Sequence, residues 1–206
     1  MKEETPSGPA ARRQHIVDAA IGVFLRYGYR RTTMADIAEA AGLTRPTLYL
    51  TFPDKEKVFK AVIDTMVANK LTAIRQGLAR RASLAAKLRF ACEAWGAEGF
   101  ELVRANPDAK DMFDFGFPPV REGCLAFEEL IAGILSEPLR HTELKIAARQ
   151  LARAIVFGMT GFKHIARDGQ EMRQLIDTQI GVVSAALNLA AERRADADGE
   201  TPNDAP

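Results

Sequence analysis

The sequence predicts an all-α fold from the distribution of its prolines, its composition and the spacing of its apolar residues. Six prolines interrupt the body of the chain and leave long proline-free runs between them. Those runs are rich in Ala, Leu, Glu, Arg and Lys, which are strong helix formers. Their apolar residues recur at intervals of three and four, without the alternation that a half-buried strand requires.

The first helix is predicted over residues 10–27, where an apolar stripe begins at Ile16 and ends at Tyr27. Gly28 is placed to end it in a left-handed conformation. Thr33 can then cap a short second helix, with Asp36 three positions later completing a capping box. That helix is expected to end at residues 41–43.

Thr44 is placed to cap a third helix, in which Pro46 is tolerated because it falls in the first turn. Phe52 and Pro53 end that helix. Asp54 then caps a long fourth helix that is expected to reach about residue 77.

Further helices are predicted over residues 83–105, 108–115, 120–136, 142–167 and 169–194, with proline or glycine at the joints. Residues 1–9 are expected to form a disordered arm and residues 195–206 a disordered tail. These elements are expected to form two domains, the first over residues 10–55 and the second over residues 56–194.

The overall composition is that of an ordinary folded protein. The chain has 206 residues, of which 47% are hydrophobic and 27% charged, and these values exclude a disordered, collagen-like or low-complexity chain. No signal-peptide core is present, and the longest uncharged stretches, 154–162 and 180–191, are shorter than the roughly 20 apolar residues that cross a bilayer. We therefore expect a cytoplasmic protein without membrane contact.

Charge and cysteine content give weaker signals. Residues 1–81 contain 14 Lys and Arg against 8 Asp and Glu, whereas the remainder contains 14 against 19. Such asymmetry suits a chain whose amino-terminal part meets a polyanion, although chance produces it as well. Cys92 and Cys124 lack metal-ligand spacing, so they are interpreted as buried thiols, with a redox or covalent-sensor role as the alternative.

The two short helices and their glycine-bearing turn form a candidate helix-turn-helix motif, which places its second helix in the DNA major groove. Leu48 and Phe52, four residues apart, are expected to face the core. Arg45 and Tyr49 then point outward, on a side that also carries Pro46, Thr47, Leu50 and Thr51. This mixture suits base edges and thymine methyl groups. A merely exposed amphipathic helix would show the same periodicity.

Residues 33–56, TMADIAEAAGLTRPTLYLTFPDKE, resemble the DNA-binding signature of the TetR family of bacterial repressors. Ile16, Ala20, Phe24, Gly28 and Tyr29 also sit where that family places its first-helix core and turn. The resemblance covers about 50 residues, and the rest of the chain is similar only in its helical character and length.

The resemblance implies DNA contacts by Thr33, Arg45, Pro46, Thr47, Tyr49, Leu50, Thr51 and Lys55. Lys55 matches a phosphate-contacting lysine, a role that the nearby helix amino terminus would support, with a solvated surface lysine as the alternative. Arg12 and Arg13 either add phosphate contacts or begin a solvated helix. Pro46 and the Leu50-Thr51 pair depart from many members, so no base preference is transferred.

The resemblance also implies a homodimer on a palindromic operator, because one short recognition helix covers too few base pairs. The expected interface comprises Leu151, Ile155, Gly158, Ile176, Ile180, Val183 and Leu187, on two apolar stripes near the carboxyl terminus. The same periodicity is explained if both stripes belong to the core of a single chain.

Aromatic residues concentrate between residues 90 and 127, and such a cluster suits an apolar small-molecule site. The expected effector contacts are Trp95, Phe113, Phe115, Phe117, Phe157 and Phe162. Core packing is the alternative for each of them taken singly.

These features together predict a regulator, most simply a repressor released from DNA by a small, largely apolar effector. The fourth helix would carry effector occupancy to the spacing of two recognition helices. An effector-independent architectural DNA binder is the second interpretation. Catalysis is not expected, because no phosphate-binding glycine loop, nucleophile elbow or metal-binding histidine pair is present. No cofactor and no metal site are predicted.

Overall fold

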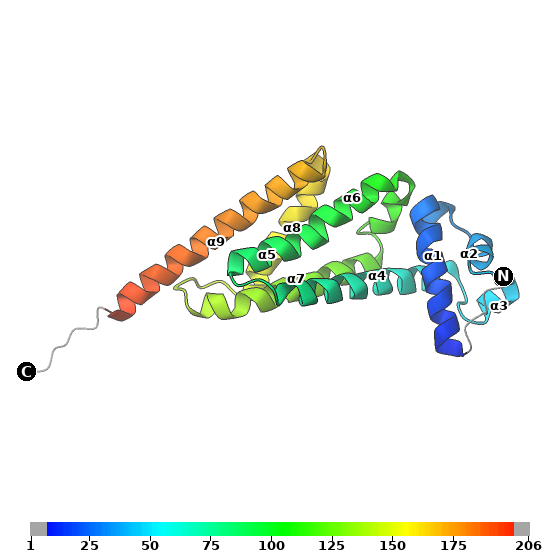
Figure 1. The fold of residues 1–206 in the computed structure, drawn as a ribbon, viewed down its shortest axis with the longest axis horizontal. Helices are drawn as coiled ribbons and strands as arrows, with labels where there is room; N and C mark the ends of the chain where they lie inside the picture. The colour runs from blue at the N-terminus through cyan, green and yellow to red at the C-terminus, as the bar shows by residue number, and fades with distance from the viewer. Residues whose placement is uncertain (1–7, 200–206) are drawn as a thin grey trace, which may run out of the picture. The chain divides into compact units, whose positions relative to one another are not determined.

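The structure is a computed structural model that describes residues 8–199, and every regular element in that range is helical (Figure 1). The predicted all-α class is therefore confirmed. The described chain forms two compact units. The first unit contains residues up to 69 together with 102–123, and the second contains residues 70–101 together with those from 124 onward. These units follow packing rather than role, so the division into 10–55 and 56–194 stays a prediction.

The first unit is built from α1 (Pro9–Arg31), α2 (Met34–Ala40), α3 (Arg45–Tyr49) and the beginning of α4 (Lys55–Leu78). The 3-10 helix η2 (Pro107–Phe113) packs against α1. Within α1 the backbone departs from helical geometry at Gly28, whose φ is 75°. The helix thus breaks where the sequence predicts, and one further helical turn follows the break.

The predicted caps explain why α2, α3 and α4 begin where they do. The Asp36 amide donates to Thr33 Oγ1 and the Thr33 amide donates to Asp36 Oδ2, which is the predicted capping box. Thr44 Oγ1 accepts from the Thr47 amide at the start of α3. The Lys57 amide donates to Asp54 Oδ1 over 2.8 Å at the start of α4. All three caps are confirmed.

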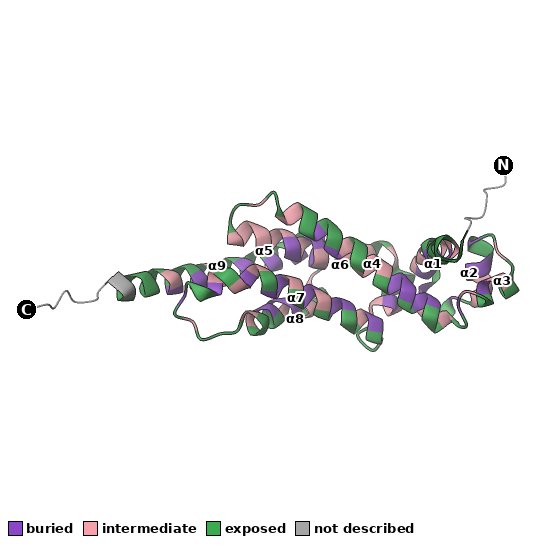
Figure 2. Ribbon diagram, turned by 90° about the horizontal axis from the view of Figure 1, so that it is seen from below, coloured by how far each residue is buried: buried purple, intermediate pink, exposed green. Residues whose placement is uncertain are grey.

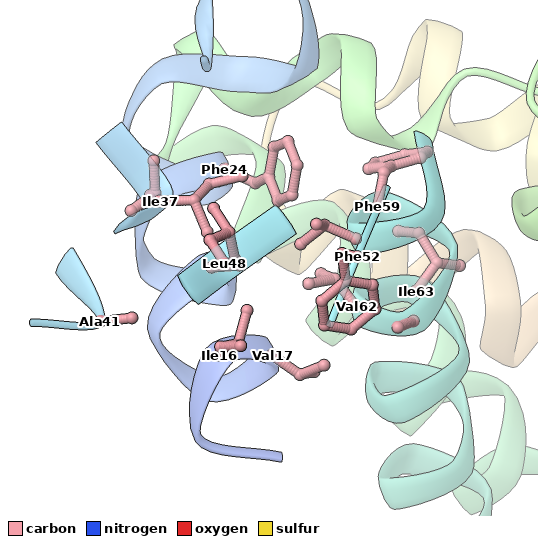
Figure 3. Close-up of a cluster of buried hydrophobic side chains, with 14 of the residues drawn as sticks. Ile16, Val17, Phe24, Ile37, Ala41, Leu48, Phe52, Phe59, Val62 and Ile63 are labelled. Carbon is pink, nitrogen blue, oxygen red and sulfur yellow. The ribbon is translucent and has the colours of Figure 1, made fainter. Parts of the chain in front are cut away.

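One apolar cluster holds the first unit together (Figure 3). Leu48 of α3 and Phe52 just after it are almost fully buried, as predicted. They pack with Ile16 and Phe24 of α1 and Ile37 of α2. Burying side chains of this size contributes about 1.5–3 kcal/mol each, so their burial fixes which side of α3 stays in solvent.

The second unit contains α5 (Leu84–Cys92), the π-helix η1 (Glu93–Ala97), α8 (Ala148–Ile165) and α9 (Gly169–Gly199). It also holds the beginning of α6 (Glu98–Ala105) and most of α7 (Pro118–Arg140). α9 packs against α5, η1 and α8. Exposed residues predominate toward the carboxyl end of α9 (Figure 2).

The predicted helix at 83–105 contains the π-helical segment η1. Gly96 in η1 lies where an added Cβ would be 3.2 Å from Ile176 Cδ1 and 3.3 Å from Met159 Sδ. Close packing against α9 and α8 therefore accompanies the π-helical turn. Apolar periodicity cannot predict such a turn. Between Asn106 and Asp114 the expected helix is the 3-10 helix η2.

Three predicted boundaries differ near the carboxyl end. Pro138 lies in the last turn of α7, where it removes one backbone hydrogen bond, and the helix ends two residues later at Arg140. Thr142 does not begin a helix, because its Oγ1 donates to Leu139 O and accepts from the Leu144 amide. α8 consequently begins at Ala148, and α9 continues to Gly199. Residues 1–7 and 200–206 of the predicted arm and tail lie outside the described residues.

Within residues 8–199, we find no helix with the length and apolar character needed to span a bilayer.

Both cysteines of the second unit are buried free thiols. Burial raises the pKa of Cys92 to about 12, with a further contribution from the Glu93 carboxylate, and burial also raises the pKa of Cys124. Only a thiolate reacts rapidly with disulfide reagents. We expect neither thiol to react with a chromogenic disulfide at pH 8 until denaturant unfolds the chain, when both should react. Rapid labelling of the native protein would favour the redox alternative.

Candidate nucleic-acid interface

The predicted recognition residues on α3 and just after it are exposed or partly exposed, whereas Leu48 of the same helix is buried. Arg45 and Pro46 are exposed, Tyr49 is 49% exposed and Leu50 is 84% exposed. Thr47 and Thr51 are partly exposed. The exposed surface thus contains a guanidinium, a phenol and an isobutyl group, which suit guanine edges, hydrogen-bonding bases and thymine methyl groups respectively.

Two threonines near this surface, Thr33 and Thr44, cap helices. Thr33 Oγ1 donates to Asp36 Oδ2 over 2.8 Å, and these hydrogen bonds from Thr33 lower the pKa of the Asp36 carboxyl. Thr47 Oγ1 lies 2.8 Å from Thr44 Oγ1. Thr33 is exposed and Thr47 is partly exposed, and a DNA contact by either residue stays a prediction.

Lys55 does not extend its ammonium into solvent. Its Nζ donates to Tyr29 O over 2.8 Å, to Thr32 O over 2.9 Å and to Arg30 O over 3.4 Å. It also lies 4.4 Å from the centre of the Tyr29 ring, within the range of a cation–π interaction. An ammonium has three N–H donors, and here each has a carbonyl within reach.

A groove of about 380 Å³ lies beside the end of α3, and no pattern in the sequence indicates it. Arg13, Lys57 and Lys60 all line this groove, and the Arg13 guanidinium lies over the Phe52 ring at 4.3 Å. Lys60 Nζ pairs with Asp64 at 3.1 Å and with Glu122 at 3.2 Å. Arg13 and Lys57 therefore supply the cationic character that a phosphate contact needs.

Asp111 is a functional candidate that sequence reasoning missed. Its carboxylate accepts hydrogen bonds from the Tyr29 amide over 2.8 Å and from the Arg30 amide over 2.9 Å. Asp111 belongs to η2, which is far from α1 in the sequence. No local sequence pattern predicts its contact with the amides of α1. The neighbouring Asp108 pairs with Arg31.

The predicted effector residues belong to both compact units. Phe117 packs against Tyr29 and Phe59 with ring centres 4.7 and 5.0 Å apart, and Phe113 borders the same core. Phe115 is exposed. In the second unit, Trp95 stacks on buried Phe127 at 4.6 Å. Phe157 and Phe162 of α8 are partly exposed, and a pocket shared by the predicted aromatics stays a prediction.

The predicted dimer residues lie on α8 and α9. Four of them are buried within the chain, namely Ile155, Ile176, Ile180 and Leu187. Leu151, Gly158 and Val183 are partly exposed. Another apolar set on these helices is clearly exposed and includes Ile165, Val182 and Leu189.

Comparison with known proteins agrees with this geometry. A family model described as bacterial regulatory proteins of the tetR family matches residues 16–62, which include α2, α3 and the start of α4. The transcriptional activator FasR of Mycolicibacterium smegmatis is 33% identical, over 46% of this chain and 46% of its own. The transcriptional repressor KstR2 of Rhodococcus jostii is 30% identical, over 63% and 66%.

The chain thus spans about half of FasR and less than two thirds of KstR2 in these matches. A solved structure, the regulator FadR of Bacillus subtilis in complex with stearoyl-CoA, has a TM-score of 0.63 at 19% identity, over 81% of this chain and 96% of FadR. That likeness extends over most of the chain and supports its fold, including the part beyond residue 62 that the family model does not match. With the amino-terminal match and the exposed α3, it leads to one conclusion: the chain belongs to the TetR family of helix-turn-helix transcriptional regulators.

Proposed function

We propose that the protein is a cytoplasmic, dimeric repressor that binds palindromic double-stranded DNA through α3 and responds to a small, largely apolar effector. The observation that carries the proposal is the outward face of α3. Tyr49 and Leu50 are large apolar side chains that remain exposed although a core lies directly behind them. Such exposure is costly in water and is explained when the side chains meet base edges.

The proposed role of each DNA-contacting residue follows from the chemistry of its side chain. Arg45 is suited to the O6 and N7 acceptors of guanine, and Leu50 to a thymine methyl group. Arg13 and Lys57, at the groove beside α3, are suited to backbone phosphates, which position a protein without specifying sequence. Residues 10–55 are the proposed DNA-binding domain, which Lys57 would assist from the first turn of α4, and residues 56–194 are the proposed regulatory domain.

We place the dimer surface on rows next to the buried stripes. On α8, Leu151, Ala154, Gly158, Gly161 and Ile165 share one helical face, and three of them are exposed. On α9, Val182, Ala185, Ala186 and Leu189 share another, and all four are exposed. Exposed apolar rows with several small residues allow helices of a second chain to approach closely.

The proposed effector is one with a substantial apolar portion. This rests on the aromatic residues of the second unit, among them the stacked Trp95 and Phe127, and on FadR, a solved neighbour that holds stearoyl-CoA. The α4 helix, which begins at Lys55 and continues past the boundary of the first unit, is the proposed carrier of the signal. A dimer fits adjacent major grooves when its two recognition helices lie about 34–36 Å apart.

The experiment begins with a random-sequence duplex library, from which the protein selects its target. We expect enrichment of a palindrome and a particle mass of two chains. Failure to enrich any duplex would overturn the proposal. Stearoyl-CoA is then titrated into the complex, with coenzyme A alone as the control. Release specific to the acyl form supports an apolar effector, and indifference to it favours the effector-independent DNA binder.

A further inference from the structure

The chain between α1 and α2 is held from two sides. Gly28 breaks α1, and Thr32, which is almost fully buried, returns a hydrogen bond from its Oγ1 to Gly28 O over 2.7 Å. Thr33 follows immediately and caps α2. Residues 28–32, here termed the hinge turn, therefore determine where the helix-turn-helix begins relative to α1.

Asp111 binds the amide side of the hinge turn. The helical turn that restarts after Gly28 has amides without intrahelical acceptors, as at the start of any helix. The two oxygens of Asp111 accept the amides of Tyr29 and Arg30, one each. Hydrogen bonds to a charged acceptor are about twice as strong as neutral ones. This carboxylate thus acts as a cap supplied by a different part of the chain.

Lys55 binds the carbonyl side of the same turn. Its ammonium reaches the carbonyls of Tyr29, Arg30 and Thr32 and lies over the Tyr29 ring. Because Lys55 is the first residue of α4, these bonds tie the turn to that helix. Donors engaged with three carbonyls are not available to a phosphate.

We propose that Lys55 and Asp111 are positioning residues that clamp the hinge turn between α4 and η2, and so set the orientation of α3 for specific DNA. Neither needs to touch DNA to do so. The inference rests on the proposed DNA binding. It also assigns Lys55 a role different from the phosphate contact that the family resemblance implies. Through Asp111, η2 would affect the position of the recognition motif directly.

The salt dependence of binding separates the two roles of Lys55. Lys55→Met should lower affinity for the selected duplex by about tenfold or more, since it removes charge-assisted hydrogen bonds. The slope of log affinity against log salt concentration should stay unchanged, as should affinity for an unrelated duplex. A lost phosphate contact would instead weaken both duplexes and reduce the slope by about 1 per subunit.

Two comparison variants sharpen this test. Lys55→Arg keeps the positive charge but replaces the three-donor ammonium with a planar fork. If Lys55 clamps the turn, the specific affinity of Lys55→Arg should be as low as that of Lys55→Met. If Lys55 contacts phosphate, it should stay close to that of the wild type. Lys57→Met removes an exposed cation of the same helix start and should reduce the salt slope.

Asp111→Asn tests the other half of the clamp, because the two hypotheses predict opposite signs. If Asp111 affects DNA binding only through the net charge of the protein, removing its negative charge should strengthen binding. The clamp predicts weaker specific binding, because one carboxylate oxygen that accepts a backbone amide becomes an NH₂ group. Asp108→Asn is the matched control, an acid on the same 3-10 helix that pairs with the exposed Arg31 side chain.

Hydrogen exchange gives a readout that does not need DNA. The amides of residues 29 and 30 should exchange faster in Asp111→Asn than in wild type, while residues 56–63 of α4 keep their protection. Unchanged exchange, or unchanged specific affinity in both Lys55→Met and Asp111→Asn, would overturn the clamp. If the wild-type protein selects no duplex, the proposed function fails, and exchange alone still decides whether the clamp exists. Circular dichroism is used to check that each variant is folded.

Discussion

Replacing Arg45 and Tyr49 together by alanine is expected to reduce specific DNA affinity by about 100-fold or more. A bidentate arginine contact to a base is worth about 1–3 kcal/mol, and a symmetric dimer loses each contact twice. Both side chains are substantially exposed, whereas Leu48 of the same helix is buried. Helicity, dimer mass and thermal stability should therefore stay close to wild type. The measurement is fluorescence titration of the selected duplex.

Arg26 and Tyr27 provide a matched control for this double variant. They are the same residue types, both exposed, in the same compact unit, and they lie near the end of α1 rather than on α3. Arg26→Ala with Tyr27→Ala removes the same charge and a similar aromatic surface. It should leave specific affinity nearly unchanged. Equal losses in the two double variants would mean that α3 is not the specific contact.

Gly28→Ala is expected to destabilise the first unit by roughly 2–5 kcal/mol, the sum of backbone strain and overpacking. The φ of Gly28 is 75°, a conformation that side chains other than hydrogen rarely adopt. An added Cβ would also lie 2.7 Å from Asp111 Oδ1 and still closer to Asp108 O. Chemical denaturation, followed by circular dichroism, measures the loss.

Gly42→Ala separates the two components of that effect. Gly42 also has a positive φ, of 63°, but an added Cβ there meets no atom within 4 Å. Only the strain of about 1–2 kcal/mol should appear. If the two substitutions cost the same, η2 does not approach the hinge turn as closely as the structure indicates.

Local chemistry was enough to predict the amino-terminal elements. The break at Gly28 and the starts of α2 and α3 depend on single residues whose preferred conformations or side-chain hydrogen bonds act within four positions. The orientation of α3 followed in the same way, since Leu48 and Phe52 lie one turn apart and both are buried. Such features are accessible because they require no knowledge of distant contacts.

Contacts between distant segments could not be predicted. Asp111 meets the amides of Tyr29 and Arg30 only once η2 is folded against α1, and no spacing in the sequence reports that meeting. The engagement of Lys55 with backbone carbonyls is likewise invisible, because every residue carries a carbonyl. On α8 and α9, apolar residues occupy both buried and exposed faces, so periodicity could not distinguish core from interface.

The most direct test of the central claim is methylation protection of the selected duplex bound to the wild-type protein. Guanine N7 lies in the major groove and adenine N3 in the minor groove, so dimethyl sulfate reports on both. We predict protection of guanine N7 in two half-sites about one helical turn apart, lost in the variant lacking Arg45 and Tyr49. A fully bound duplex whose guanines all stay reactive, with only adenine N3 protected, would contradict docking of α3 in the major groove.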